Sequence, residues 1–220
     1  MRRVLPILFL IPTMAFAQSK FLLGVNAGGV LNSYMFSKAV GPFDSEGKLN
    51  WEFGLSGKYF INQKFALDMK ANVASKNFTS VINFDLYVWT DPSDPTFGRS
   101  GTDRYSVSQT YVEVPISLSY FPKGIDRKFN TYVSLGIVNS KKVSTSSSNA
   151  NFINQNSTDQ YSDFLISVKP AFGIMFDIGE GFACFSELNS SIYLQKVGLS
   201  ANPFQLGLNF SVLKKLGKAN

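Results

Sequence analysis

The sequence predicts an all-β protein: an eight-stranded antiparallel up-and-down transmembrane β-barrel with a side-chain-filled polar interior. Three observations lead to this fold class. Eight segments of the 220 residues alternate apolar and polar residues with period two, which is typical of strands with two unlike faces. Long and short connections between these segments also alternate. Only 16% of the residues are charged, whereas a soluble domain has about 25%, so much of the surface is expected to meet lipid.

The first 17 residues are expected to be a secretory signal peptide. Arg2 and Arg3 precede an apolar run over 4–16, and Ala-Phe-Ala at 15–17 matches a cleavage site. The apolar run is shorter than the roughly 20 residues that a spanning helix needs. Residues 18–220 are therefore expected to form one exported barrel domain. Its lone cysteine, Cys184, cannot form a disulfide within the chain.

The first four strands are expected at 21–31, 51–61, 65–73 and 110–120. Every second residue in them is apolar, and the residues between are mostly polar or small. The last of the four has the strictest alternation. Its apolar face holds Val112, Val114, Ile116, Leu118 and Tyr120, and its opposite face holds Tyr111, Glu113, Pro115, Ser117 and Ser119.

The other four strands are expected at 129–138, 164–178, 182–194 and 204–213. The segment 164–178 is apolar at eight alternate positions, whereas 182–194 is the least regular. A soluble sandwich does not need an apolar face of that length. We therefore expect the apolar faces to lie outward, in lipid, and the polar faces to line the lumen. Closure of the sheet pairs every backbone group, which lipid requires.

The connections are expected to be short at one end of the barrel and long at the other. Short periplasmic turns and longer extracellular loops are typical of outer-membrane barrels. Aromatic residues bracket the short turns at 62–63, 122–128 and 179–181, which indicates an interfacial girdle or, alternatively, the ordinary preference of rings for strands. The long loops are expected at 37–48, 76–104, 141–160 and 196–202.

The longest connection carries a candidate partner-binding segment. Apolar residues resume at 82–88 on the opposite parity, which predicts a bulge or break near 75–80 and a hairpin that continues beyond the membrane. Exposed rings and an open strand edge suit the addition of a partner's strand. The candidate residues are Tyr87, Trp89, Asp91, Asp94, Phe97 and Arg99.

The polar faces are expected to bring charged residues together in the lumen. An eight-stranded barrel is just wide enough for side chains to fill it, and buried charges must be paired. A salt-bridged plug that holds the barrel rigid is the favoured interpretation, and an ion path or proton relay is the alternative. Pro115 removes a ladder donor, so a bulge or local break is expected there. The expected network consists of Glu52, Lys58, Asp68, Lys70, Glu113, Lys169 and Glu187.

Catalysis is not expected. The chain has no histidine, which excludes Ser-His-Asp and histidine–metal chemistry within it. Asp91, Asp94 and Asp103 lack the spacing of a calcium-binding loop, so no metal and no cofactor is predicted. The 21 basic and 15 acidic residues are scattered along the chain, which does not favour nucleic-acid binding. No small-molecule substrate can be identified.

Three stretches resemble the PorT-like outer-membrane β-barrel family of Bacteroidetes-type envelopes. They are GVNAGGVLNSY from Gly24, YVEVPISLSYFPKG from Tyr111 and the alternating C-terminal strands. The most specific pattern is YxEVPxxLxY, and the resemblance covers nearly the whole mature chain. It implies a small integral barrel without an assigned activity, and the named member of the family is associated with protein secretion. The pattern is matched by Tyr111, Glu113, Val114, Pro115, Leu118 and Tyr120.

These observations predict a non-enzymatic protein of the Gram-negative outer membrane. A structural, adhesive or export-accessory role would be exerted through the extracellular loops, with outer-membrane lipid and envelope or surface proteins as partners. The alternative is a secreted soluble barrel that binds an apolar ligand, as lipocalins do. That alternative requires the apolar faces to line the cavity.

Overall fold

Ten β-strands make up most of the described part of the chain, which comprises residues 21–33, 43–83, 101–125, 127–147, 163–179, 181–194 and 204–216 of the computed structural model. No helix within these ranges is long and apolar enough to cross a membrane. The strands are β1 (Phe21–Ser33), β2 (Phe43–Gly47), β3 (Leu49–Phe60), β4 (Phe65–Ser75), β5 (Phe78–Asn83), β6 (Thr102–Tyr120), β7 (Phe129–Ser147), β8 (Phe164–Gly179), β9 (Phe182–Tyr193) and β10 (Phe204–Leu216).

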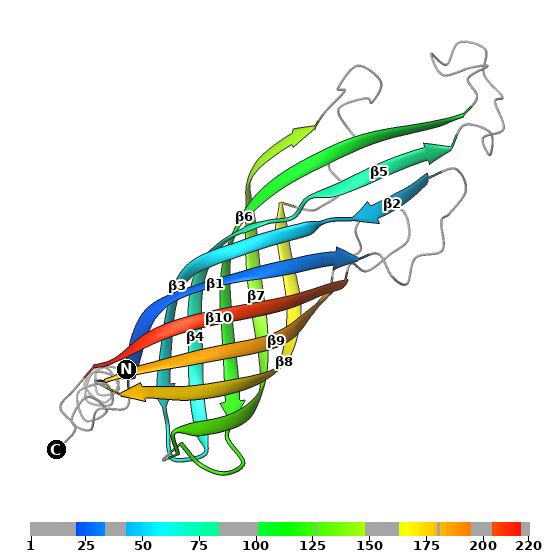
Figure 1. Cartoon of the computed structure of the whole chain (residues 1–220). Coiled ribbons are helices and arrows are strands. Elements are labelled where there is room, and N and C mark those ends of the chain that lie inside the picture. The colour runs from blue at the N-terminus through cyan, green and yellow to red at the C-terminus, as the bar shows by residue number, and fades with distance from the viewer. Residues whose placement is uncertain are drawn as a thin grey trace, which may run out of the picture.

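Eight of these strands close into an antiparallel barrel in the order β1-β3-β4-β6-β7-β8-β9-β10 (Figure 1). The pairing of β1 with β10 runs from Phe21 opposite Leu216 to Ser33 opposite Phe204, so the two ends of the described chain lie side by side. The pairing of β6 with β7 completes the circle of neighbours. The predicted eight-stranded up-and-down barrel is therefore confirmed.

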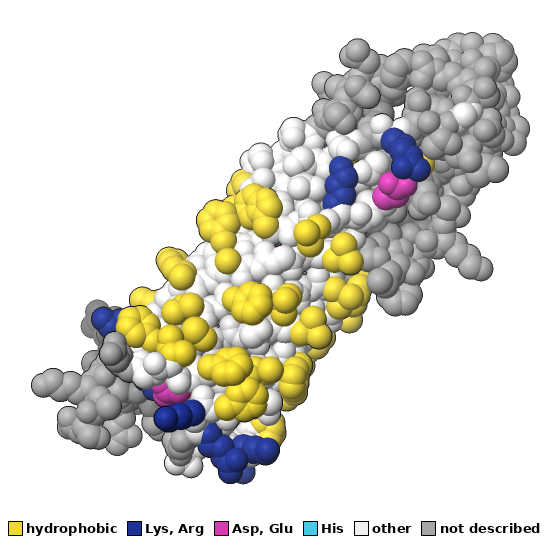
Figure 2. Space-filling view, in the orientation of Figure 1, with side chains coloured by type: hydrophobic (Ala, Val, Ile, Leu, Met, Phe, Trp, Pro, Cys, Tyr) yellow, Lys and Arg dark blue, Asp and Glu magenta, His cyan; other side chains and the backbone are white. Residues whose placement is uncertain are grey.

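The apolar faces of the strands lie on the outside of the barrel. In β6, Val112, Ile116 and Leu118 are 41–47% exposed, whereas Tyr111 and Glu113 are buried in the lumen. Figure 2 shows the hydrophobic side chains as a band over the barrel strands. A lipocalin-like carrier needs the reverse arrangement, so that alternative is excluded.

Two strands are interrupted where they leave the barrel. β2 and β3 are separated by Lys48, and β4 and β5 are separated by Lys76 and Asn77. β2 pairs with β5, and β5 pairs with the first residues of β6, so these three strands form an extension of the barrel wall (Figure 1). We call this end of the barrel the extension end.

The strands are longer than expected because backbone pairing continues beyond the lipid-facing band. Strand residues occupy part of the expected loops 37–48, 76–104 and 141–160, where β2, β5, the start of β6 and the end of β7 lie. β2 and the end of β7 are mostly polar, and polar strands carry no apolar alternation by which to recognise them. The pairing of β5 with the start of β6 is the described part of the hairpin that was expected beyond the membrane. The expected signal peptide, 1–17, and the expected loop 196–202 lie outside the described residues.

Of the bulge or break expected near 75–80, the structure has the break, and it occurs without a change of register. Ser75 lies opposite Thr110 and Phe78 opposite Val107, so β4 and β5 keep one register with β6. The register does shift by one residue between the pairing of β3 with β4 and the pairing of β2 with β5. The additional residue lies on the β2–β3 side, where Lys48 separates the two strands. The apolar residues change parity because the strand leaves the lipid: Phe78 and Val107 are buried on the inner face.

Pro115 interrupts the ladder locally, as expected. Met69 pairs with Ile116 and Asn72 pairs with Glu113, but the two residue pairs between them do not form a ladder. The register is the same on both sides of the gap. The local break is therefore confirmed, and the bulge that was its alternative is absent at this position.

The opposite end of the barrel, which we call the turn end, carries the short connections β3–β4, β6–β7 and β8–β9 together with the start of β1 and the end of β10. Outward-facing rings meet in pairs there. The centroids of Phe65 and Tyr120 lie 5.1 Å apart, and those of Phe129 and Phe176 also lie 5.1 Å apart. These rings form the girdle that the sequence predicts.

Candidate functional site

The candidate site is the lumen, where inward-facing positions of all eight barrel strands place polar side chains. Glu113 on β6 and Glu187 on β9 are buried there because the alternate positions of the same strands are apolar and face outward. All seven charged residues of the expected network point into the lumen. An eighth, Lys76, joins them.

The lumen charges of the described residues form ion pairs one to one, four lysines with four acids. Lys76 Nζ lies 2.6 Å from Glu113 Oε1, and Lys58 pairs with Asp68. The other two pairs are Lys70 with Glu187 and Lys169 with Glu52, each at 3.3 Å. Because a buried charge without a partner is costly, the matching numbers keep this network electrically neutral.

Two of these ion pairs span the barrel. β3 and β8 are four strands apart in the circle of eight, as are β4 and β9. The Lys169–Glu52 pair therefore joins opposite walls, and the Lys70–Glu187 pair does the same. Each of them acts as a strut across the lumen near its middle.

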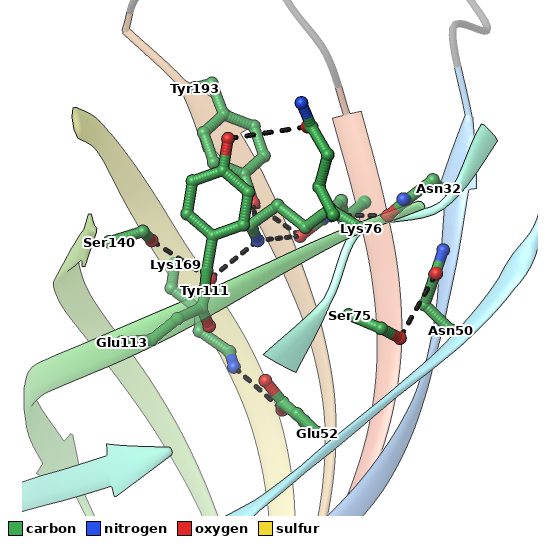
Figure 3. Close-up of polar contacts among 12 residues, drawn as sticks. Asn32, Asn50, Glu52, Ser75, Lys76, Tyr111, Glu113, Ser140, Lys169 and Tyr193 are labelled. Carbon is green, nitrogen blue, oxygen red and sulfur yellow. Dashed lines mark hydrogen bonds and ion pairs between the residues drawn. The ribbon is translucent and has the colours of Figure 1, made fainter. Parts of the chain in front are cut away.

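The cluster nearest the extension end is built around Lys76 (Figure 3). The Lys76 ammonium donates to Tyr193 Oη at 2.6 Å and lies 5.4 Å from the centre of the Tyr111 ring. The Tyr193 hydroxyl donates to Gln205 Oε1 at 2.6 Å. Glu113, the ion-pair partner of Lys76, also accepts a hydrogen bond from Ser140 at 2.9 Å. Lys76, Tyr111 and Tyr193 are almost fully buried, so these side chains close the lumen at this level.

The middle level holds the two struts with their hydrogen bonds. Asn209 donates to the same Glu52 oxygen that pairs with Lys169. The Tyr132 hydroxyl donates to Glu187 at 3.3 Å. A water-sized cavity in the wall opens beside Pro115, where the ladder between β4 and β6 is interrupted.

The level nearest the turn end is an apolar plug. Lys58 bridges the plug and the polar lumen: its ammonium pairs with Asp68 and lies 4.8–5.7 Å from three ring centroids. Such contacts between a cation and aromatic faces favour a lysine even in apolar surroundings. The plug consists of Leu22, Phe60, Ala66, Phe121, Tyr132, Met175, Ala183, Phe185 and Leu213.

Gly173 makes room for one ring of the plug. It lies opposite Tyr132 in the pairing of β7 with β8. A Cβ atom at Gly173 would lie 2.2 Å from Tyr132 Cζ, so the ring rests on the bare backbone of the facing strand. The small residue and the large one together fill the cross-section of the barrel at this height.

The family is decided by comparison with known proteins. The model of the outer membrane protein beta-barrel domain matches residues 16–194. The chain belongs to this family. No curated protein sequence matches it significantly.

Solved structures show the same fold. The barrel resembles the Neisserial surface protein A, with a TM-score of 0.55 and 12% identity over 90% of this chain and 98% of that chain. Escherichia coli outer membrane protein W matches with a TM-score of 0.46 and 13% identity, over 90% and 98% of the two chains. Membership of the outer membrane protein beta-barrel family makes the protein an integral barrel of the outer membrane, and its apolar band contacts lipid.

The sequence-predicted loop residues cannot be placed beside this lumen. Tyr87, Trp89, Asp91, Asp94, Phe97 and Arg99 lie outside the described residues. Within the part of the chain that the structure describes, no group of three His, Cys, Asp or Glu side chains could hold a metal ion.

Sequence reasoning missed Lys76, which was expected to begin a loop. The signal was present: the inward face of β4 continues at every second residue from Asp68 through Lys70 and Asn72. Extending that parity by two more steps reaches Lys76. The same reasoning left Tyr111 and Tyr193 without a role, although both face the lumen.

Proposed function

We propose that the protein is a closed, non-enzymatic barrel of the outer membrane that anchors a surface-contact element at its extension end. The single observation that carries this proposal is the one-to-one pairing of lumen lysines and acids between an aromatic cluster above and an apolar plug below. A lumen that is filled and neutral at every level favours rigidity over conduction.

The charge network is proposed to be structural. An ion path needs charged groups with spare hydrogen-bonding capacity and water on both sides. Here Glu52 is held by Lys169 and Asn209, and Glu113 is held by Lys76 and Ser140. These contacts favour a plug over a relay.

Reconstitution of the purified protein into a planar bilayer tests the closed lumen. We expect no stable conductance steps at potentials at which a porin of known conductance, inserted in the same membrane, conducts. The Lys169→Met/Glu52→Leu variant, which removes a strut but keeps the side-chain volume, should also remain closed. Stable steps from the wild-type protein would refute the plug.

The functional contacts are proposed to lie at the extension end, which faces the outside when the short turns face the periplasm. Strands β2, β5 and β6 extend beyond the apolar band. In the sequence, the candidate residues from Tyr87 to Arg99 lie between the end of β5 and the start of β6. β2 is the edge of this extension among the described strands, and an open strand edge suits contact with another surface molecule. An adhesive or structural role follows.

An export-accessory role is the second candidate, and the resemblance of the YxEVPxxLxY strand to the PorT-like family favours it. Replacing 91–99 with a Gly-Ser segment of equal length tests the contribution of this loop without altering the barrel. After cross-linking in intact cells, the variant should no longer co-purify with envelope proteins, while its barrel should still migrate as a folded band on a gel before heating. An unchanged set of partners would exclude a role for this segment, and a loss of exported surface proteins would favour the export role over adhesion.

A further inference from the structure

The turn end of the barrel presents a ring of basic side chains. Figure 2 shows Lys and Arg side chains gathered there, beyond the hydrophobic band. We call this ring the basic collar. It consists of Lys64, Lys123, Arg127, Lys128 and Lys214, all exposed.

Acidic residues at the turn end do not balance the collar. Among the described residues there, the acid is Asp177, and its carboxylate lies 2.5 Å from the ammonium of Lys215, a sixth cation. The sequence adds Asp126 and Glu180 at this end, which lie outside the described residues. The turn end therefore keeps an excess of positive charge.

Hydrogen bonds between neighbouring turns fix the collar in place. The amide of Phe121 donates to the carbonyl of Lys64 at 2.8 Å, and the amide of Asp177 donates to the carbonyl of Lys128 at 2.8 Å. The amide of Lys215 donates to the carbonyl of Gly181 at 2.6 Å. The turns thus form a connected rim, and the backbone positions of the cations on it are fixed relative to one another.

The aromatic girdle places the collar at the depth of lipid headgroups. Tyr and Phe rings mark the boundary between hydrocarbon and headgroups in such barrels. Phe65 directly follows Lys64, and Phe129 directly follows Lys128. On β10, Lys214 lies 5.9 Å from the centre of the Phe182 ring. Three of the five collar cations, Lys64, Lys128 and Lys214, are therefore close to a ring that marks the boundary and are placed to reach a phosphate.

We infer that the basic collar binds the headgroups of anionic phospholipids in the leaflet that surrounds the turn end. Two observations carry the inference together: an unbalanced positive rim, and a girdle that sets this rim at headgroup level. Cations close to a membrane surface attract anionic lipids, and this attraction weakens as salt shortens the screening length. The inference is independent of the role proposed for the extension end.

Native mass spectrometry of the full mature chain tests the collar. The folded protein in neutral detergent is mixed with equal amounts of phosphatidylglycerol and phosphatidylcholine that carry the same acyl chains. We expect the wild-type protein to retain at least fivefold more phosphatidylglycerol than phosphatidylcholine. This preference should fall to twofold or less when four collar cations are neutralised by Lys64→Gln, Lys123→Gln, Arg127→Gln and Lys128→Gln.

A matched control removes the same charge from the other end of the barrel. Lys48→Gln, Arg104→Gln, Lys141→Gln and Lys142→Gln should leave the lipid preference within twofold of the wild-type value. If a fourfold variant fails to fold, the salt dependence of the wild-type protein provides the test. Its preference for phosphatidylglycerol should fall at least threefold between 0.1 M and 1 M salt.

Several outcomes would overturn the inference. They are an equal retention of the two lipids by the wild-type protein, a preference that survives neutralisation of the collar, and an equal loss in the control variant. Co-sedimentation with peptidoglycan that depends on the collar, without a preference for phosphatidylglycerol, would assign the rim to the cell wall instead.

Discussion

Lys76 and Glu113 form an ion pair of 2.6 Å inside the barrel, although Lys76 lies in the break between two strands. The side chains of both residues are at most 6% exposed. The break lets the chain bend out of the barrel while the Lys76 amide still donates to Gln109. The chain thus passes from β4 to β5 at Lys76, the residue whose side chain helps to close the lumen.

Removing one member of this pair should destabilise the barrel strongly. Glu113→Gln leaves the Lys76 ammonium without its counter-charge, and breaking a buried pair in this way costs about 3–5 kcal/mol. The double variant Lys76→Met/Glu113→Leu removes both charges and should recover most of that loss. Urea unfolding in detergent micelles, followed by tryptophan fluorescence, measures both values.

The exposed pair of Arg104 and Glu46 is the control for that experiment. Its side chains are 63% and 48% exposed, and surface ion pairs contribute about 0–1 kcal/mol. Arg104→Gln should therefore change the free energy of unfolding by less than about 1 kcal/mol. Equal losses from the buried and the exposed pair would mean that the lumen pairs do not hold the barrel together.

A side chain at Gly173 should disturb the plug. The methyl group of Gly173→Ala meets the Tyr132 ring, which is packed among the plug residues and donates to Glu187. Overpacking of this kind costs about 1–3 kcal/mol. The midpoint of urea unfolding should fall accordingly.

Gly29 provides the matched strand glycine, because a Cβ atom there would meet only Leu49 Cδ1, at 3.8 Å. Gly29→Ala should leave the midpoint close to the wild-type value. A Gly173→Ala protein as stable as Gly29→Ala would show that the Tyr132 ring can move aside without cost.

The sequence was sufficient to predict seven of the eight paired lumen charges in the described residues, all but Lys76, but not which of them meet. Strict alternation in β6 assigns Glu113 to the inside, since a one-residue slip would expose it to lipid. The partners depend on the barrel as a whole. Lys169 reaches Glu52 because their strands are on opposite walls of a circle of eight, a distance that no single strand encodes.

The strands beyond the membrane were harder to predict for a related reason. Within lipid, the environment forces one face to be apolar, and the pattern follows the backbone. Phe78 belongs to the inward parity of β4 but is apolar, because above the lipid the inner face can hold apolar residues again. The change of hydrophobic parity therefore reflects a change of environment. The break near 75–80, one of the two expected alternatives, occurs without a change of register.

The pair of Asp163 and Lys142 should respond to pH at the extension end. The Lys142 ammonium, 3.0 Å away, lowers the pKa of the exposed Asp163 carboxyl by a hydrogen bond and by its charge. A lowered folded-state pKa means that the contribution of the pair is complete above the ordinary aspartate range. It is lost as the pH falls through the lowered value.

NMR titration of the Asp163 carboxyl measures this pKa directly. We expect a midpoint below the ordinary aspartate value in the wild-type protein and a return toward that value in Lys142→Gln. Lys142→Arg, which keeps the charge, should keep the low midpoint. Equal midpoints in the wild-type and Lys142→Gln proteins would exclude the pair as the cause.

A charge on the lipid face should be costly in proportion to its depth in the membrane. Leu135 lies opposite Leu118 and Pro170 in the middle of the apolar band and is 60% exposed. Leu135→Arg should destabilise the barrel in lipid vesicles by about 2–4 kcal/mol. Val143 on the same strand is similarly exposed, at 57%, but is surrounded by Lys141 and Ser144 beyond the band. Val143→Arg should therefore cost only about 0–1 kcal/mol.

Unfolding titrations of both variants in vesicles of one lipid composition provide the comparison. Because the two residues lie on the same strand and have similar exposure, a difference between them reports mainly their depth in the bilayer. Equal costs at the two positions would contradict the placement of the lipid boundary between Leu135 and Val143. A repeat in detergent should shrink the difference, since a micelle adapts its thickness to the charge more readily than a bilayer does.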